Sequence, residues 1–323
     1  MLRYIFYLFF IDLCKIIVYT LNKLKIIGGY FMKKDELGAR MKKYENVSRV
    51  YLMRRNPVII RIDGKAFHSF TKGMSKPFDE ILMKSMDLTT KYLCENIQGC
   101  KIGYTQSDEI SLLLVDYENN DSSAWFDNNI QKLASVSASM ATLAFNKAFS
   151  ELAGQYIYSL ENYNSIEDEE ILFERYGIKT YKNEEEEVCI PSEYEKLKEV
   201  YKKRLMTALF DSRVFSLPKE EVVNYFIWRQ QDAIRNSIQS VGQANFSHKQ
   251  LHGKSTNIVK EMLREKSTEL DWDLLDTKYK YGRCLVKKEY SLEQGIIRTR
   301  WEVDESIPFF KEDREYIEKY VYI

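Results

Sequence analysis

Apolar and polar side chains alternate just before residue 64, which predicts a β-strand. One face of this strand would carry Val58, Ile60 and Ile62, and the other Ile59, Arg61 and Asp63. The apolar positions then follow a helical stripe from Asp79-Glu80 to about Asn96, where acidic residues in the first turn suit the helix dipole. Two short strand-like runs come next, Lys101–Thr105 and Ile110–Val115, and they predict a hairpin.

The second half of the chain repeats this alternation of helix and strand. Residues 129–153 are rich in Ala and Ser and predict a helix that packs closely on a sheet. The later predicted elements are a strand at Leu209–Leu217, an amphipathic helix from Pro218 to about Gln239, a helix at Thr256–Lys266, and strands near Lys280–Tyr290 and Ile296–Val303. The order strand, helix, hairpin, helix predicts an α+β fold with a ferredoxin-like core, in which an antiparallel sheet has helices on one face, plus a helical C-terminal part.

Residues 155–205 break this pattern. They are dense in Lys and Glu and include the run Glu184–Glu187, which indicates a solvated, partly helical surface arm rather than core. We therefore expect a core at 32–154, a charged insertion at 155–205 and the remainder of the core with a C-terminal region at 206–323.

The first 31 residues differ from the rest. Tyr4–Ile11 is apolar, but charged residues interrupt the segment after it, and a membrane span needs about 20 apolar residues, so no membrane association is expected. A signal peptide is weakly supported, because the apolar run has no small-residue cleavage pattern after it. Gly28-Gly29 can be encoded by a purine-rich ribosome-binding sequence in front of Met32. We therefore expect residues 1–31 to be an untranslated or non-native extension, which the intact mass of the natural protein would test.

The composition limits the number of domains and the kinds of site that the chain can form. The 323 residues, 45% of them hydrophobic, suffice for one large domain or two modest ones. Lys plus Arg equals Asp plus Glu at 48 each, so any nucleic-acid surface must be local. The five cysteines form no Cys-x-x-Cys pair, which argues against a zinc knuckle or a disulfide framework and suits a reducing cytoplasm.

Carboxylates occur where two strands end. Asp63-Gly64 closes the first strand, and Ser107-Asp108-Glu109 lies at the hairpin tip. A strand-helix-hairpin path would place Asp63 and Asp108 side by side, which is the arrangement that holds two magnesium ions for phosphoryl chemistry. The alternative for Asp63 is a strand-end cap, and Arg61 would be either its salt-bridge partner or a phosphate contact.

Other motifs are weaker. His248 and His252 have a zinc-like spacing but no third ligand nearby, so we expect no metal there. Gly253-Lys254-Ser255-Thr256 imitates the end of a P-loop without a preceding strand, which favours helix capping by Ser255 or Thr256. The chain also has two basic zones, which we interpret as solvated faces or, alternatively, as contacts for RNA phosphates and bases. The first comprises Lys249, Lys254, Lys260, Arg264 and Lys266, and the second comprises Lys278, Lys280, Arg283, Lys287 and Lys288 with Tyr279 and Tyr281.

Four ordered motifs closely resemble the tRNA-histidine guanylyltransferase family and its Thg1-like relatives. They are the segments 63–70, 106–109, 210–214 and 228–232, with the sequences DGKAFHSF, QSDE, FDSRV and WRQQD. The resemblance covers roughly residues 35–150 and 206–300. It implies a core similar to the palm of polymerases, 3′-to-5′ nucleotide addition to tRNA 5′ ends, and the use of ATP, GTP and other nucleoside triphosphates by a cytoplasmic homotetramer.

The resemblance also implies roles for individual residues. Two Mg²⁺ ions would be held by Asp63, the Gly64 carbonyl and Asp108, with Glu109 as a supporting catalytic carboxylate. Nucleotide contacts would come from Asp63, Gly64, Lys65, Ala66, Phe67, His68, Ser107 and Asp108. Phosphates of the triphosphate or the tRNA would meet Arg61, Lys132, Arg213 and Lys260.

Two departures from the family pattern bear on specificity. Histidine-specific enzymes carry His-Ile-Asn-Asn where this chain has Ile234-Arg235-Asn236-Ser237, and a basic cluster before Lys132 is replaced by Asp127-Asn128-Asn129. This favours the Thg1-like branch, which repairs truncated tRNA 5′ ends using the opposite strand as template. The alternatives are a strict guanylyltransferase for histidine tRNA, a nucleotide cyclase on a similar core, and a non-catalytic RNA-binding module.

Overall fold

The computed structural model describes residues 36–163, 166–183, 188–291 and 297–323. The chain falls into two compact units, Met1–Val50 and Tyr51–Ile323. In the described part of the first unit, helix α2 (Glu36–Val47) has no buried residue. The expectation for residues 1–31 lies outside the described residues. No helix in the described ranges is both long and apolar enough to cross a membrane.

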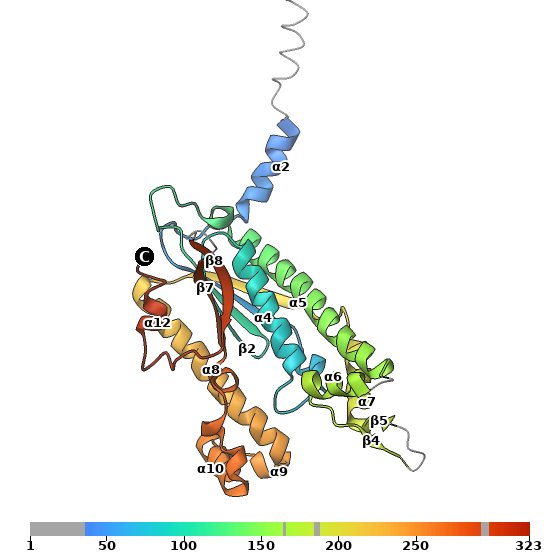
Figure 1. Cartoon of the computed structure of the whole chain (residues 1–323). Helices are drawn as coiled ribbons and strands as arrows, with labels where there is room; N and C mark the ends of the chain where they lie inside the picture. The colour runs from blue at the N-terminus through green and yellow to red at the C-terminus, as the bar shows by residue number, and fades with distance from the viewer. Residues whose placement is uncertain (1–35, 164–165, 184–187, 292–296) are drawn as a thin grey trace, which may run out of the picture. The chain divides into compact units, whose positions relative to one another are not determined.

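The second unit is built on a six-stranded antiparallel sheet (Figure 1). Its first elements are β1 (Val58–Gly64), α4 (Glu80–Asn96), β2 (Cys100–Gln106), β3 (Glu109–Leu114), α5 (Ile130–Glu161) and β6 (Phe210–Ser216). The strand order β6-β1-β3-β2 with this βαββαβ connectivity is the ferredoxin-like arrangement. Strands β7 (Arg283–Ser291) and β8 (Ile297–Asp304) extend the sheet beyond β2. The predicted fold class is therefore confirmed.

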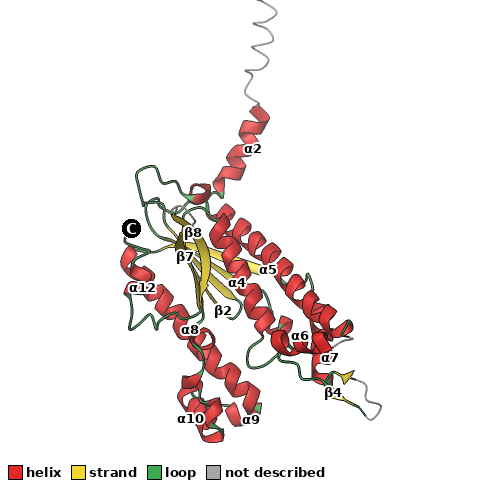
Figure 2. Cartoon of the chain, viewed as in Figure 1, coloured by secondary structure: helices red, strands yellow, loops and turns green. Residues whose placement is uncertain are grey.

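The alternation in β1 separates two hydrophobic cores. Ile60 and Ile62 belong to the core beneath α4 and α5, which lie side by side on one face of the sheet (Figure 2). Ile59 belongs to a second core on the other face, formed with the first half of α8 (Lys219–Asn245) and the C-terminal residues. Helices therefore pack on both faces, because the C-terminal part covers the face that the ferredoxin-like unit leaves open.

Helix starts were better predicted than helix ends. The Asp79 carboxylate caps α4 by accepting a hydrogen bond of 2.9 Å from the Leu82 amide, and the helix ends at Asn96 as expected. α5 continues past 153 to Glu161 because Tyr156 and Leu160 still face the core. α8 likewise continues past Gln239 to Asn245.

The charged segment 155–205 is not simply a surface arm. After α5 it forms α6 (Ile166–Tyr176), β4 (Tyr181–Lys182), β5 (Val188–Cys189) and α7 (Ser192–Arg204). Leu172, Ile178 and Tyr201 are buried in the main core, so the expectation of a segment outside the core was wrong for its inner face. The composition of the segment reveals its many solvated positions, but it does not reveal the few apolar residues that pack in the core. The run Glu184–Glu187 lies outside the described residues.

The C-terminal region contains several short helices. α9 (His248–Leu251) and α10 (Thr256–Lys266) pack against the end of α8 around Trp272. Ser255 accepts a hydrogen bond from the Ile258 amide, which confirms its predicted capping role. The remaining α-helices of the described residues are α3 (Phe67–Phe70), α11 (Thr277–Tyr281) and α12 (Glu315–Glu318). Lys280 lies in α11, so the strand predicted to begin there begins instead at Arg283, after a turn at Gly282 with φ of 82°.

Candidate active site

Strand register brings the predicted carboxylates to one end of the sheet. Asp63 stands opposite Glu109 across the β1–β3 pair and opposite Asp211 across the β1–β6 pair. Directly opposed residues in antiparallel strands point to the same face. The turn between β2 and β3 then folds toward β1, where the Gly64 amide donates to the Asp108 carbonyl at 3.1 Å. Asp63, Asp108 and Glu109 therefore meet as the sequence predicts.

Asp108 lies in an environment that disfavours its charge. Partial burial raises the pKa of the Asp108 carboxyl, and the nearby Asp63 carboxylate adds to this effect. The Ser107 hydroxyl opposes it by donating to Asp108 Oδ1 at 3.0 Å. Two carboxylates that repel each other at the end of a sheet favour the binding of a cation between them.

Glu109 is held by two arginines. Its Oε2 lies 2.7 Å from Arg61 Nη2 and 2.8 Å from Arg229 Nη1, and the residue is almost fully buried. Arg61 therefore pairs with Glu109 and not with Asp63, which was the alternative to its predicted phosphate contact. The cation beside Asp63 is instead Arg213, at 3.7 Å between Nη1 and Oδ2.

The donor set suits a hard metal ion. In the described ranges, no three His, Cys, Asp or Glu side chains are grouped so as to hold a metal. Asp63 and Asp108 with the main-chain carbonyl of Gly64 would supply oxygen ligands of the kind that Mg²⁺ prefers, leaving other positions for water and phosphate. Glu109 Oε1 is buried and accepts no hydrogen bond from the described residues, which leaves one further carboxylate oxygen beside this pair.

Arg229 is a buried part of the site that the sequence reasoning missed. It is 1% exposed, it contacts Asp232 at 2.5 Å as well as Glu109, and its guanidinium lies 3.5 Å from the Trp228 ring centroid. The motif 228–232 contained the signal, since Arg229 and Asp232 are one helical turn apart. The motif alone did not reveal that Arg229 reaches the hairpin.

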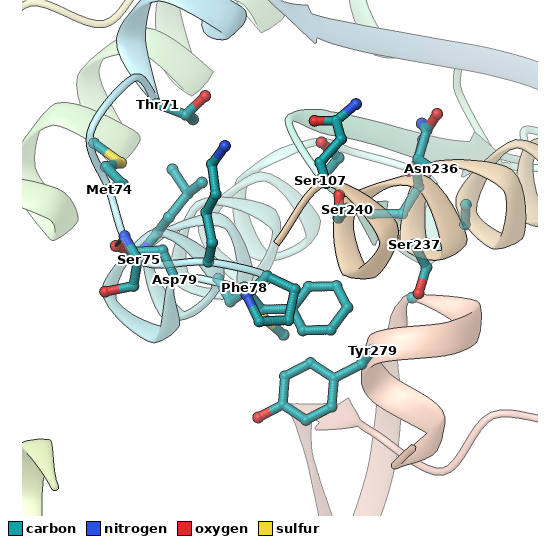
Figure 3. A pocket seen from close by; sticks show the side chains of 18 of the residues that line it. Thr71, Met74, Ser75, Phe78, Asp79, Ser107, Asn236, Ser237, Ser240 and Tyr279 are labelled. Atoms are coloured by element: carbon teal, nitrogen blue, oxygen red, sulfur yellow. Dashed lines mark hydrogen bonds between the residues drawn. The ribbon is translucent and has the colours of Figure 1, made fainter. Parts of the chain in front are cut away.

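A cavity of about 500 Å³ adjoins this end of the sheet (Figure 3). Two of the predicted nucleotide contacts, His68 and Ser107, line it. Most of the rest of the wall comes from residues 71–79, from α8 and from Tyr279, whose ring stacks on Phe78 at 4.7 Å. On α8 the lining residues are Ala233, Asn236, Ser237, Ser240 and Gln243. Sequence reasoning did not find this wall, because its parts lie far apart in the chain.

The segment after Asp63 turns tightly. A Cβ on Gly64 would lie 2.2 Å from the Phe67 ring, so no side chain fits there. Ala66 adopts a left-handed conformation with φ of 55°, which starts α3. The Phe67 side chain is buried against Phe145 and Phe210, so a nucleotide could meet only its backbone. Lys65 and His68 are exposed.

The predicted phosphate contacts are spread over several elements. Arg213 is about half exposed on β6 beside Asp63. Lys132 lies in the first turn of α5, 5.7 Å from the Phe126 ring centroid. Lys260 lies on α10 and forms an ion pair of 2.6 Å with Asp273. Of these three cations, Arg213 is the one that reaches a carboxylate of the site within the described part of the chain.

Many cations of the two basic zones have carboxylate partners. The pairs are Arg264 with Asp271 and Asp273, Lys278 with Glu80 and Glu305, Arg283 with Asp87, and Lys288 with Glu302. The two zones therefore offer less free positive charge to RNA than their sequences suggest.

Known proteins resemble this chain along most of its length. The profile of the family described as tRNAHis guanylyltransferase (Thg1) matches residues 38–218. A bacterial tRNA(His) guanylyltransferase (Thg1)-like protein in complex with ATP is 40% identical, with a TM-score of 0.66 over 88% of this chain and 99% of that one. A bacterial Thg1-like protein in complex with GTP is 38% identical, with a TM-score of 0.65 over 90% and 100% of the two chains.

Two curated relatives are more distant. An uncharacterized protein, R259, of Acanthamoeba polyphaga mimivirus is 25% identical over 79% of this chain and 78% of its own length. The tRNA(His) guanylyltransferase of Schizosaccharomyces pombe is 31% identical over 32% of this chain and 38% of its own length. Because the family profile covers more than half of the chain and the Thg1-like structures align along nearly their whole length, this chain belongs to the Thg1 family and is a nucleotidyltransferase.

Proposed function

We propose that this enzyme adds nucleotides to tRNA 5′ ends in the 3′-to-5′ direction, with each nucleotide chosen by pairing with the opposite strand. The observation that carries the proposal is the meeting of Asp63 and Asp108 beside a cavity lined by Ser107 and His68. A triphosphate that contacts these carboxylates through magnesium could place its nucleoside in the cavity. The Thg1-like structures in complex with ATP and GTP support this use of the site.

The residues have separate tasks in this proposal. Asp63, Asp108 and the Gly64 carbonyl would hold two Mg²⁺ ions. These ions would lower the pKa of the nucleotide hydroxyl that attacks and neutralise charge on the phosphates. Arg213, exposed beside Asp63, would contact a phosphate oxygen. Glu109 accepts from both Arg61 and Arg229 and so fixes the hairpin that carries Asp108.

The α8 sequence supports the repair activity over strict histidine-tRNA guanylylation. Asn236 and Ser237 line the cavity, whereas Ile234, at the position where histidine-specific enzymes have His, packs against the hydrophobic cluster around Trp272. An apolar contact at 234 removes a side chain that could hydrogen-bond to RNA. Base pairing would then have to supply the discrimination.

The test uses tRNAs that lack their first nucleotide. We expect the protein, with Mg²⁺, ATP and all four nucleoside triphosphates, to restore the missing nucleotide on several tRNA species. Changing the template base opposite the gap should change the added nucleotide, as read by sequencing, and EDTA should abolish addition. Addition of guanosine irrespective of the template, and only to histidine tRNA, would support the alternative of a histidine-tRNA guanylyltransferase.

A further inference from the structure

Helix α7 lies against the segment that forms one wall of the cavity. α7 belongs to the charged region 155–205, which has no part in the four motifs. Its last residues nevertheless contact the segment 69–79 at four points, and residues 71–79 of that segment line the cavity (Figure 3).

The first contact is made by Tyr201. Its hydroxyl donates to Asp79 Oδ2 at 2.7 Å, and both residues are almost fully buried. The same oxygen accepts from the Ser75 amide at 3.1 Å, while Oδ1 accepts from the Leu82 amide. One carboxylate therefore joins the cavity wall, the start of α4 and α7. Burial, reinforced by the Asp79 charge, raises the pKa of Tyr201, so the phenol keeps the proton that it donates.

The other contacts come from Arg204 and Val200. The Arg204 guanidinium donates to the Ser69 and Phe70 carbonyls, both at 2.9 Å, at the end of the short helix that carries His68. A Cβ added to Gly73 would lie 2.9 Å from Val200 Cγ2, so α7 packs directly on the backbone there. Gly73 also has a φ of 91°, which a side chain would strain.

We propose that Tyr201 and Arg204 are positioning residues for the nucleotide-binding cavity, so that the charged region 155–205 sets the affinity for the bound nucleoside triphosphate. The inference rests on the proposed function of the cavity. Neither side chain is among the residues that line the cavity, so both would act through Asp79 and the backbone of 69–79. Without these anchors the segment would sample other conformations, and nucleotide binding would have to select the competent one.

The test compares Tyr201→Phe and Arg204→Gln with the full-length wild type. We expect the dissociation constant for ATP to rise roughly 10-fold in each variant, because a hydrogen bond to a charged group is lost. The KM for ATP should rise similarly, while kcat at saturating ATP stays within about 2-fold, since saturating nucleotide restores the segment. Without nucleotide, hydrogen exchange of the Ser75 and Leu82 amides should become faster in Tyr201→Phe.

Matched controls remove a hydroxyl or a positive charge at exposed positions of the same region. Tyr181→Phe removes a hydroxyl from an exposed tyrosine, and Lys203→Gln removes a charge next to Arg204. Both controls should leave ATP affinity and exchange unchanged. Unchanged ATP affinity in Tyr201→Phe and Arg204→Gln, or an equal loss in the controls, would overturn the inference. If the wild type binds no ATP, the proposed function fails, and the exchange rates alone decide whether α7 holds the segment.

Discussion

At the scale of single residues, the three carboxylates of the site have different surroundings. Asp63 is about one third exposed, Asp108 is bound by the Ser107 hydroxyl, and Glu109 is buried between two arginines. The guanidinium groups neutralise Glu109, which leaves Asp63 and Asp108 as the pair whose charge a metal would balance.

We expect Asp63→Asn and Asp108→Asn each to lower nucleotide addition by at least about 100-fold, because each removes one charged ligand from a shared site. The thermal midpoint should not fall, since relief of repulsion between the two carboxylates offsets the lost contacts. Single-turnover addition to a truncated tRNA, together with thermal unfolding, measures both effects. Asp121→Asn, on an exposed loop, is the matched control. Near-normal turnover of either site variant at saturating Mg²⁺ would rule out the metal assignment.

Gly64 is constrained by its neighbour and not by its dihedral angles. We expect Gly64→Ala to destabilise the protein by about 1–3 kcal/mol, because the new Cβ would lie 2.2 Å from the Phe67 ring in a packed core. Chemical denaturation measures the loss. Gly154→Ala is the control, since a Cβ there meets no atom within 4 Å. It lies within α5, so it should be neutral or stabilising.

Residue-level prediction from the sequence succeeded for residues at the ends of predicted strands. Asp63 and Asp108 were expected to meet because a single helix and a hairpin join them. The pairing of Glu109 with Arg61 and Arg229 was not predicted, because β-sheet register and helix packing bring these residues together although Arg229 lies far along the chain. Such contacts depend on how α8 packs, which the pattern of β1 does not contain.

At the scale of elements, α8 joins the site to the rest of the fold through Arg229. This guanidinium is buried, and its two carboxylate partners lie on different elements, Glu109 on β3 and Asp232 on α8 itself. Removing one partner of a buried ionic network leaves uncompensated charge in a low-dielectric interior.

We expect Arg229→Met to lower the free energy of unfolding by about 3–5 kcal/mol, because the buried Glu109 carboxylate would lose one of its two arginine partners. Urea denaturation followed by circular dichroism checks this value. Arg235→Met is the control: this exposed arginine also pairs with Asp232, and its loss should cost less than about 1 kcal/mol. Equal costs for the two variants would show that the Arg229 network adds nothing beyond a surface ion pair.

The types of the main elements could be predicted from periodicity, whereas their lengths and partners could not. The strands and the start of α4 matched because alternation and capping are local. The end of α5 and the inner face of 155–205 were misjudged because Leu160, Leu172 and Tyr201 are isolated apolar positions in a charged sequence. Only tertiary packing shows that these positions are buried.

At the scale of the whole molecule, positive and negative charges balance, and the predicted phosphate contacts differ in how closely a carboxylate pairs with them. With 48 cationic and 48 anionic residues, the chain has no net positive charge, so binding of tRNA must rely on local groups of cations. Lys260 is neutralised by Asp273 at 2.6 Å, while Arg213 lies farther, at 3.7 Å, from Asp63 and 3.3 Å from Asp211.

We expect Arg213→Gln to weaken tRNA or triphosphate binding more than Lys260→Gln does. If Arg213 meets a tRNA phosphate, the slope of log affinity against log salt should fall by about 1 for Arg213→Gln and change little for Lys260→Gln. Filter binding of a truncated tRNA over a salt series, together with KM values for ATP, shows whether Arg213 contacts a tRNA phosphate or the triphosphate. Equal slopes and equal KM values in the two variants would remove Arg213 from the phosphate-binding role.

The continuous helix α8 fixes the spacing between three parts of the molecule. One uninterrupted helix packs on the sheet through Phe226, lines the cavity through Asn236 and closes the Trp272 cluster through Val241. Because each residue turns an α-helix by about 100°, a single residue inserted after Asp232 would swing the cavity-lining side chains and the whole 246–281 region around the axis together, while the sheet contacts stayed in place. A substitution in α8 therefore acts at one position, whereas an insertion or deletion would displace the cavity wall and the Trp272 cluster together.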